Sequence, residues 1–427
     1  MKKTLAEWLS WQETFHLSEI DLGLDRIRKV ATKLDLLSPT FPIITVAGTN
    51  GKGSTVALFE SILNAQGYKT GSYTSPHLNE YNERIKLNAI NAKDDLIVEA
   101  FEEIDNARGD ISLTYFEFGT LAAMLLFIKQ NIDVAILEVG LGGRLDASNL
   151  WDTSLAIITN IGIDHVDWLG DDRDIIAIEK SGIMRKDIPA ICGDLNPPDN
   201  IAKEARRIGA NLYQISHEFS YHKNDDNTWI WEGFNKKHTL PLTALAGAFQ
   251  LNNAATVVAG LQIVNNLLPV TQESIKQGLK KVSLTGRLQT IHHNPEWLID
   301  VAHNPDAAKQ LAKHLQTHSI NGKTIALFSM LKDKDIQQVV SIMDQYIDAW
   351  HIVELEGSRS TKLCELKEII NKQNPDKTVV THQSFSDAIK SIKTSSNLQD
   401  RVVAFGSFLV VSELIKLMRP FVRGNNK

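Results

Sequence analysis

Residues Ile43–Thr55 read IITVAGTNGKGST, and this stretch decides the fold. Its first five residues, 43–47, form a short β-branched run that is typical of a buried strand. A glycine-rich turn follows, and then a helical stretch in which the apolar residues Val56, Phe59 and Leu63 recur three or four positions apart. A strand that leads through such a turn into a helix is the building unit of doubly wound sheets. We therefore predict an α/β fold with this unit at its centre.

The same alternation of strand and helix continues along the chain. Nearly continuous apolar runs are typical of parallel strands that are covered on both faces. We expect strands at residues 68–73, 134–139, 155–159, 188–192, 212–215, 297–301, 324–328, 351–353, 377–380 and 402–405. We expect helices at residues 118–130, 200–209, 244–265, 271–281, 305–317, 335–347, 363–371, 384–393 and 407–418. Residues 217–240 interrupt the alternation and predict a small antiparallel insertion.

The alternation starts afresh after residues 282–287, which places a domain boundary there. The 427 residues are enough for two or three separate cores. We predict two doubly wound domains, a larger N-terminal one over residues 1–283 and a smaller, Rossmann-like C-terminal one over residues 284–427.

Composition excludes several classes of protein. Hydrophobic residues make up 43% of the chain and charged residues 22%, which excludes disorder as the main state. The net charge of −6 lacks the positive field of a nucleic-acid or membrane-surface binder. Two cysteines are too few for a disulfide framework, and Glu7 and Glu13 interrupt any secretory signal. The longest uncharged apolar stretch, residues 118–128, falls short of the ~20 residues of a membrane span. The sequence therefore predicts a cytoplasmic protein with small-molecule partners.

The turn after the first strand, GTNGKGST at residues 48–55, predicts phosphate binding. Its glycines let several backbone N–H groups surround a phosphate, the helix N-terminus adds partial positive charge, and Lys52 adds a full charge. The stretch departs from the standard phosphate-loop pattern, because Val46 stands where the first glycine would be and Gly53 follows the lysine. The alternative is a glycine-rich turn that binds no ligand.

Polar residues follow other strands of the same predicted sheet. Glu138 ends one strand, His165 lies just beyond the next, and Ser75 follows the strand at residues 68–73. Because carboxyl ends of parallel strands meet at one edge, these side chains are expected to converge. A carboxylate beside a phosphate loop suits Mg²⁺, which prefers hard oxygen ligands. Taken singly, Glu138 could be a salt-bridge partner and His165 a structural histidine.

Three further charged residues lie at the ends of predicted elements or near the domain boundary. Lys180 lies at the end of a helix, where spacing alone favours a solvated cap. Asp300 lies where a strand meets a helix and suits either a ribose hydroxyl or an Asx turn. Arg287, near the domain boundary, is a candidate phosphate clamp because arginine binds phosphate in bidentate fashion.

The order of these motifs resembles that of the Mur ligase superfamily, and within it the bacterial bifunctional dihydrofolate synthases/folylpolyglutamate synthases. The resemblance extends from about Leu5 to Met418. It is carried by GTNGKGS (48–54), TSPHL (74–78), EVGLGGRLDASN (138–149), the Asp164-His165 pair, EKSG (179–182) and DVAHNP (300–305).

The resemblance implies a larger ATPase domain of Mur ligase type and a smaller domain on the nucleotide and glutamate side. The implied reaction adds L-glutamate to dihydropteroate and to tetrahydrofolate or folylpolyglutamates, through an acyl phosphate made with ATP, in folate biosynthesis. A carboxylate must approach the anionic triphosphate, so cations have to neutralise it. The implied cofactors are one or two Mg²⁺ ions, with a monovalent cation such as K⁺ as an optional addition, and the implied state is a cytoplasmic monomer.

The resemblance also implies roles for individual residues. For ATP these are Thr49, Asn50, Gly51, Lys52, Gly53, Ser54, Asn253, Arg287 and Asp300, with His303 adjoining. For the metal they are Ser75, Glu138 and His165, and for catalysis Lys52, Lys180 and His165. Lys180 would be an N6-carboxylysine, which requires a neutral amine and hence a lowered pKa. Pteroate or folate would contact Asp21, Leu22, Thr114, Tyr115, Phe116, Glu117, Leu145 and Asp146. The Tyr115–Phe116 pair suits a flat ring, although core packing is the alternative.

Two other functions are weighed against this one. A cell-wall ligase acting on a UDP-sugar peptide would be expected to carry an extra N-terminal domain, whereas only 42 residues precede the strand at 43–47. A nucleotide-dependent switch would use the phosphate loop for conformational control. Such a switch would cleave ATP steadily without a carboxylate substrate. Alternatively, it would bind ATP in the presence of that substrate and never cleave it.

Overall fold

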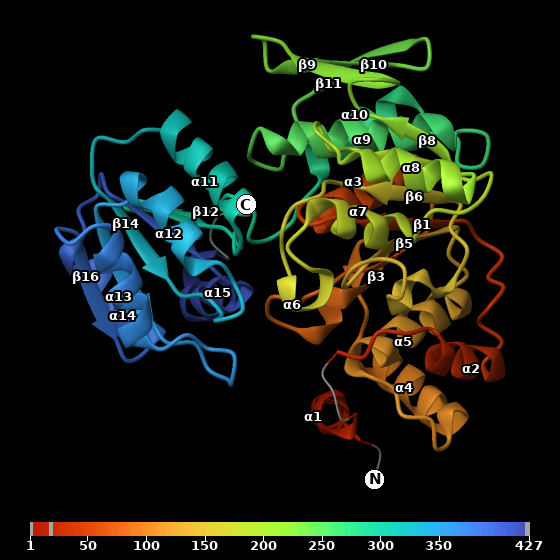
Figure 1. Cartoon of the computed structure of the whole chain (residues 1–427), viewed down its shortest axis with the longest axis horizontal. Helices are drawn as coiled ribbons and strands as arrows, with labels where there is room; N and C mark the ends of the chain where they lie inside the picture. The colour runs from red at the N-terminus through yellow and green to blue at the C-terminus, as the bar shows by residue number, and fades with distance from the viewer. Residues whose placement is uncertain (1–2, 17–19, 423–427) are drawn as a thin grey trace. The chain divides into compact units, whose positions relative to one another are not determined.

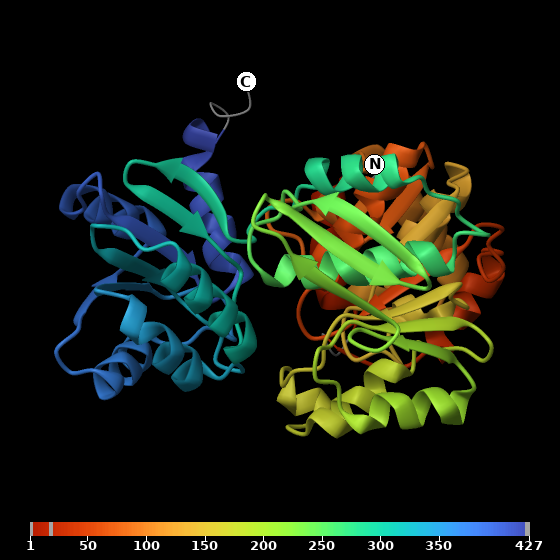
Figure 2. The ribbon, with the colours of Figure 1, turned by 90° about the horizontal axis from the view of Figure 1, so that it is seen from above.

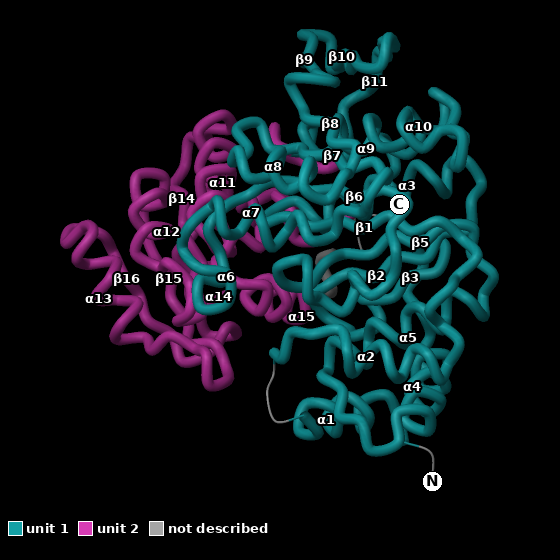
Figure 3. Tube along the Cα trace, turned by 45° about the vertical axis from the view of Figure 1, so that its right-hand side comes forward, with its two compact units in different colours: residues 1–244, 250–283 teal, residues 245–249, 284–427 magenta. Residues whose placement is uncertain are grey.

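The structure is a computed structural model that describes residues 3–16 and 20–422, with side chains described as far as residue 418. The chain divides into two compact units (Figure 3). Unit 1 comprises residues 1–244 and 250–283, and unit 2 comprises residues 245–249 and 284–427. Each unit is built around a sheet of its own.

Unit 1 contains an eight-stranded sheet, among the described residues, in the order β4-β3-β2-β5-β1-β6-β7-β8 (Figure 1). Its strands are β1 (Ile43–Ala47), β2 (Thr70–Tyr73), β3 (Ile85–Leu87), β4 (Ile90–Asn91), β5 (Val134–Glu138), β6 (Leu155–Ile158), β7 (Pro189–Cys192) and β8 (Asn211–Gln214). Six of them are parallel, while β3 and β4 form an antiparallel edge. The predicted doubly wound sheet is confirmed. The edge strands were missed because two or three residues are too short to show a hydrophobic period.

Helices cover both faces of this sheet, as its fully buried strands require. The face formed by Ile43, Ala135 and Leu137 packs on α5, and α1, α2 and α4 belong to the same hydrophobic core. Helices α7 and α8 cover the rest of this face. On the other face α3 and α9 approach closely, because a Cβ at Gly260 would lie 2.9 Å from Phe59. The helices are α1 (Leu5–Phe15), α2 (Asp25–Lys33), α3 (Lys52–Gln66), α4 (Asp94–Arg108), α5 (Tyr115–Lys129), α6 (Val166–Leu169), α7 (Arg173–Ser181), α8 (Asp199–Ile208), α9 (Phe249–Ile263) and α10 (Gln272–Lys281).

The predicted helix at residues 244–265 is wrong at its start, because α9 begins only at Phe249. Gly247 has φ +105°, a left-handed conformation that ends regular helix geometry. A Cβ at this position would lie 2.8 Å from Leu288, so the chain here packs within unit 2. An apolar run long enough for one helix thus contains a crossing between the units.

The predicted antiparallel insertion is confirmed. Strands β9 (Phe219–Lys223), β10 (Thr228–Gly233) and β11 (Lys236–Pro241) form a three-stranded sheet. It lies over α9 and α10 (Figure 2). The buried Trp231 fixes it there, since its indole N–H donates to the carbonyl of Ala255 at 3.0 Å.

Unit 2 has a six-stranded sheet, in the described residues, in the order β12-β13-β17-β14-β15-β16. The strands are β12 (Gln289–His293), β13 (Glu296–Ile299), β14 (Thr324–Phe328), β15 (Ala349–Val353), β16 (Thr378–His382) and β17 (Arg401–Phe405). The helices are α11 (Pro305–Thr317), α12 (Ile336–Met343), α13 (Leu363–Gln373), α14 (Phe385–Ser395) and α15 (Phe408–Val422). The five predicted parallel strands are confirmed, whereas the antiparallel β12 was not predicted.

No helix of the described residues combines the length and the apolar character that crossing a bilayer requires.

Candidate active site

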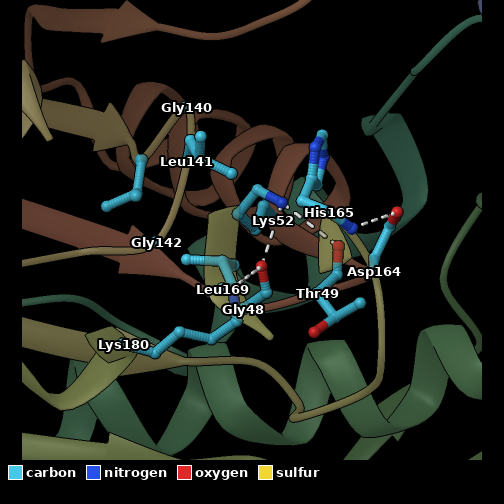
Figure 4. A pocket seen from close by; sticks show the side chains of 11 residues that line it. Gly48, Thr49, Lys52, Gly140, Leu141, Gly142, Asp164, His165, Leu169 and Lys180 are labelled. Atoms are coloured by element: carbon cyan, nitrogen blue, oxygen red, sulfur yellow. Dashed lines mark hydrogen bonds between the residues drawn. The ribbon is translucent and has the colours of Figure 1, made fainter. Parts of the chain in front are cut away.

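A pocket lies in unit 1 where β5, β1 and β6 end side by side (Figure 4). After β1 the chain continues to β2, on the β5 side of β1, whereas the later strands β6, β7 and β8 lie on the opposite side of β1. The strand order therefore reverses at β1. Open α/β sheets bind their ligands at such a point. The pocket is lined by Gly48, Thr49, Lys52, Val139, Gly140, Leu141, Gly142, Asp164, His165, Leu169 and Lys180.

The loop between β1 and α3 is held against the end of β6. The N–H groups of Thr49 and Asn50 donate to the backbone and side-chain oxygens of Asn160, at 3.0 and 2.8 Å. In return the hydroxyl of Thr159 donates to the carbonyl of Asn50 at 2.6 Å. Gly48 has φ +146°, and a Cβ there would lie 1.8 Å from Thr159 Oγ1. Glycine is therefore required at this position both for its conformation and for space.

Asn253 lies beside the same loop, brought there by α9. Gly51 has φ +86° and precedes α3 as its N-cap residue, and a Cβ on it would lie 2.8 Å from Asn253 Oδ1. The Asn253 amide donates to Gln250 at 2.9 Å, and Gln250 donates to the buried hydroxyl of Ser54 at 3.1 Å. The structure thus joins Asn253 to Gly51 and Ser54, which are 202 and 199 residues away in the chain.

Two lysines share one acceptor in the pocket (Figure 4). Lys52 Nζ donates to the carbonyls of Gly48 and Thr49, at 3.0 and 3.1 Å. Lys180 Nζ donates to the same Gly48 carbonyl at 3.1 Å. The charge of Lys52 and the amine of Lys180 thus lie side by side, where an anionic group would sit.

Lys180 is buried, with 4% of its surface exposed. Burial, and after it the positive charge of Lys52, lower its pKa from the usual 10.5 to about 7, although the charges of Asp164 and Asp146 oppose the shift. A large share of Lys180 is therefore neutral near pH 7. This is the state that carboxylation of the amine requires.

The loop after β5 is what buries Lys180. A Cβ on Gly143 would lie 2.6 Å from the carbonyl of Glu179, and the N–H of Arg144 donates to that carbonyl at 3.0 Å. The Arg144 guanidinium also pairs with the Glu179 carboxylate at 2.6 Å. The loop is thus fixed against the end of α7, and the interpretation of Lys180 as a solvated cap is wrong.

The donors predicted for a metal come from strands that end at the same edge of the sheet, because Ser75 follows β2, Glu138 ends β5 and His165 follows β6. The N–H of Ser75 donates to Oε2 of Glu138 at 3.2 Å, and Glu138 is buried. His165 has a left-handed conformation (φ +54°), precedes α6 and lines the pocket. Its backbone N–H donates to Asp164 Oδ1 at 2.8 Å. No three His, Cys, Asp or Glu side chains converge in the described part of the chain. This donor set consists of a carboxylate, a hydroxyl and an imidazole. Its chemistry suits a divalent cation that takes its other ligands from phosphate and water.

The predicted pteroate residues on α5 form its N-terminal cap. The hydroxyl of Thr114 accepts from the N–H of Glu117 at 3.2 Å, and the Glu117 carboxylate accepts from the N–H of Thr114 at 2.7 Å. Burial raises the pKa of Glu117, which the hydrogen bond from Thr114 and the charge of Arg26 oppose. Tyr115 and Phe116, on the first turn, are half-buried.

The other pteroate segments reach the same region. The N–H of Gly23, next to Asp21 and Leu22, donates to the carbonyl of Leu145 at 3.2 Å. The ring of Phe116 lies against Gly140, where a Cβ would be 2.7 Å from the ring and 3.2 Å from Asp146 Oδ2. Burial raises the pKa of Asp146, and the N–H of Leu141 donates to its carboxylate at 2.8 Å. Segments 21–22, 114–117 and 145–146 are therefore neighbours.

In unit 2 the predicted residues gather around the end of β13. Asp300 is buried, and its Oδ1 accepts the N–H of Ala302 at 2.8 Å, so the Asx turn is present. Burial raises the pKa of Asp300, and Arg287 opposes that shift. The Arg287 guanidinium lies 5.3 Å from the centre of the Phe408 ring, and the centres of the His303 and Phe408 rings are 5.8 Å apart.

Several residues that build the site were not predicted from the sequence. Thr159 and Asn160 organise the phosphate loop, and they lie nearer to the end of β6 than His165 does. The strand-end signal that indicates His165 could therefore have found them. His16 and Arg26 contact predicted pteroate residues, but no local pattern marks them.

A glycine-rich loop at the switch point of a doubly wound sheet, with two lysines, a carboxylate and an imidazole beside it, defines a nucleotide-dependent enzyme that acts on phosphate groups. Residues 46–261 match the Mur ligase middle domain, and residues 286–408 match the Mur ligase, glutamate ligase domain.

Individual relatives match the whole chain. The dihydrofolate synthase/folylpolyglutamate synthase of Escherichia coli (strain K12) is 40% identical over 414 residues, which cover 97% of this chain and 95% of that protein. The structure of E. coli FolC in complex with DHPP and ADP has a TM-score of 0.93 at 39% identity, and 98% of each chain is covered. A bifunctional folylpolyglutamate synthase/dihydrofolate synthase with Mn, AMPPNP and L-glutamate bound has a TM-score of 0.90 at 39% identity and the same coverage. The chain belongs to the Mur ligase family, and within it to the dihydrofolate synthases/folylpolyglutamate synthases.

Proposed function

We propose that the protein is an ATP-dependent ligase that joins L-glutamate to dihydropteroate, giving dihydrofolate, and to tetrahydrofolate and folylpolyglutamates, in folate biosynthesis. The observation that carries this proposal is the convergence of Lys52 and Lys180 on the Gly48 carbonyl, in a pocket that His165 also lines. The named activity of the E. coli relative and the DHPP, ADP and glutamate bound in related structures support it.

The chemistry follows from what the pocket can neutralise. The loop at residues 48–54 and the N-terminus of α3 bind the phosphates, with Lys52 balancing their charge. A carboxylate oxygen of pteroate attacks the γ-phosphorus, and ADP leaves. The amine of glutamate then attacks the acyl carbon, an amide bond forms, and inorganic phosphate leaves with the oxygen that came from the carboxylate. Asn253, on α9, would contact the nucleotide, since it lies against Gly51 of the loop.

Ser75, Glu138 and His165 are proposed to hold Mg²⁺, which screens the negative charge of the phosphates when it is bound. The Mn ion in a related structure supports a divalent metal. K⁺ is proposed as an optional addition, on the family resemblance alone.

Lys180 is proposed to carry an N6-carboxyl group. Its neutral amine adds to CO₂, an N–C bond forms, and a proton leaves to solvent. The product is a carbamate anion where an ordinary lysine would be a cation, so it can bind a second Mg²⁺. The burial of Lys180 and its pKa of about 7 support this reaction.

The remaining assignments divide between the units. Residues 1–283 are proposed as the ATP-binding ligase domain, and residues 284–427 as the domain on the nucleotide and glutamate side. In the second, Arg287 would contact phosphate and Asp300 the ribose, with His303 adjoining. Pteroate would contact Asp21, Leu22, Thr114, Tyr115, Phe116, Glu117, Leu145 and Asp146, which the contacts above bring together.

A cytoplasmic monomer with small-molecule partners is also proposed. Cys192 and Cys364 are unpaired although Cys364 is exposed, which suits a reducing compartment. The cell-wall and switch alternatives are less well supported, because a folate-ligase relative matches 97% of the chain.

The test is an assay of purified protein with ATP, Mg²⁺, dihydropteroate and labelled glutamate. We expect labelled dihydrofolate and one ADP per amide bond. Tetrahydrofolate in place of dihydropteroate tests the second activity. Steady ATP cleavage that is independent of any carboxylate acceptor would instead favour the switch.

A further inference from the structure

Five polar side chains form one connected group beside the proposed pteroate segments. We call it the Arg26 network, and it consists of His16, Asp21, Arg26, Ser112 and Glu117. Arg26 Nη1 pairs with Asp21 Oδ2 at 2.6 Å, and Nη2 donates to the Asp21 carbonyl at 2.7 Å and to Glu117 Oε1 at 3.3 Å. His16 contacts Asp21 Oδ2 through Nε2 at 3.2 Å and Ser112 Oγ through Nδ1 at 2.7 Å.

We propose that Arg26 and His16 are positioning residues that set the affinity for the pteroate end of the substrate. They act by fixing Asp21 and Glu117 relative to each other and do not touch the reacting atoms. The inference rests on the proposed function, which assigns Asp21 and Glu117 to pteroate.

Only an arginine can make the central contacts of this network. Its planar fork reaches three oxygens at once, namely the Asp21 carboxylate, the Asp21 carbonyl and the Glu117 carboxylate. A lysine offers a single nitrogen, so it keeps the charge but cannot hold both segments in one geometry.

The partly buried position of the network makes these contacts effective. The Glu117 side chain is 3% exposed and that of Arg26 28%, so water screens the pair only in part. The charge of Arg26 opposes the rise in the pKa of Glu117 that burial causes. Arg26 thereby favours the carboxylate form of Glu117, which accepts the Thr114 N–H and fixes the first turn of α5, where Tyr115 and Phe116 lie.

His16, the residue that follows α1, links Asp21 to Ser112. With Asp21 as acceptor, Nε2 carries the proton and Nδ1 accepts the hydroxyl hydrogen of Ser112. A third link, from the N–H of Gly23 to the carbonyl of Leu145, extends the network to segment 145–146.

The decisive variant is Arg26→Gln, studied by steady-state kinetics. We expect KM for dihydropteroate to rise about tenfold or more, because charge-assisted hydrogen bonds are lost. In contrast, kcat should change less than about twofold and KM for ATP should not change, since the contacts of Arg26 are to the proposed pteroate residues. Arg26→Lys should restore part of the affinity. Arg28→Gln is the matched control, because it removes the same charge from an exposed position on the same helix.

Ser112→Ala is the milder variant in case Arg26→Gln fails to fold. It removes only the hydrogen bond to His16 and should raise KM for dihydropteroate about two- to fivefold. An unchanged KM in this variant or in a folded Arg26→Gln protein, or an equal rise in KM for ATP, overturns the inference. If the wild-type protein makes no product from dihydropteroate, the proposed function fails first, so the two failures are distinguishable.

Discussion

Lys52→Ala should leave the fold intact and lower kcat for amide formation by about 10²–10³-fold, the usual cost of losing one preorganised donor to a developing charge. Lys52 is the N-terminal residue of α3, and its amine lies against the Gly48 and Thr49 carbonyls in the pocket. Without it, the reacting carboxylate meets a triphosphate whose charge is less well neutralised. The measurement is kcat with saturating ATP, together with the affinity for a non-cleavable ATP analogue.

The control for Lys52→Ala is Lys29→Ala, which removes the same charge from an exposed position on α2. Lys29→Ala should retain wild-type kcat. Because the Lys52 amine also bonds two loop carbonyls, thermal unfolding of both variants is compared with that of the wild type. A folded Lys52→Ala protein with normal kcat would remove Lys52 from the mechanism.

Lys180→Ala is the second large effect, and it should also lower kcat by about 10²–10³-fold. The proposed carbamate would bind metal, and the variant has neither an anion nor an amine at that place. Short carboxylic acids such as acetate or propionate would supply a carboxylate in place of the missing carbamate. They should restore part of the activity of Lys180→Ala and none of that of Lys52→Ala.

The same assignment predicts how carboxylation depends on pH. At a pKa of about 7 the neutral fraction of Lys180 rises as pH increases from 6 to 8, whereas an ordinary lysine at pH 7.5 is only ~0.1% neutral. Protein depleted of CO₂ should therefore regain activity on addition of bicarbonate, to a greater extent at pH 8 than at pH 6. With ¹³C-bicarbonate, a carbamate signal should appear in the wild type and be missing from Lys180→Ala. Wild-type activity without that signal contradicts the carbamate.

The sequence predicts most of the sheet and the phosphate loop because these depend on local pattern. A short β-branched run, a glycine-rich turn and a stretch with apolar residues three or four positions apart identify β1 and α3 without any distant contact. The doubly wound order then brings the ends of β5 and β6 to the same edge, so Glu138 and His165 could be placed there. The roles assigned from the family resemblance stay predictions.

What could not be predicted depends on contacts between distant residues. The burial of Lys180 comes from the loop at residues 140–144, about 40 positions earlier, which packs on the end of α7. Arg26 and Glu117 are 91 residues apart, and an exposed arginine has the same local pattern as this one. The late start of α9 likewise reflects packing of residues 245–249 in unit 2, which composition does not reveal.

The most direct measurement follows the carboxylate oxygen during turnover. Dihydropteroate labelled with ¹⁸O in its carboxylate is incubated with the protein, ATP, Mg²⁺ and L-glutamate, and the inorganic phosphate is analysed by mass. Activation of the carboxylate by ATP predicts one ¹⁸O atom in the phosphate for each amide bond formed. If phosphate is released with no ¹⁸O while dihydrofolate accumulates, the carboxylate was never phosphorylated and the account is contradicted.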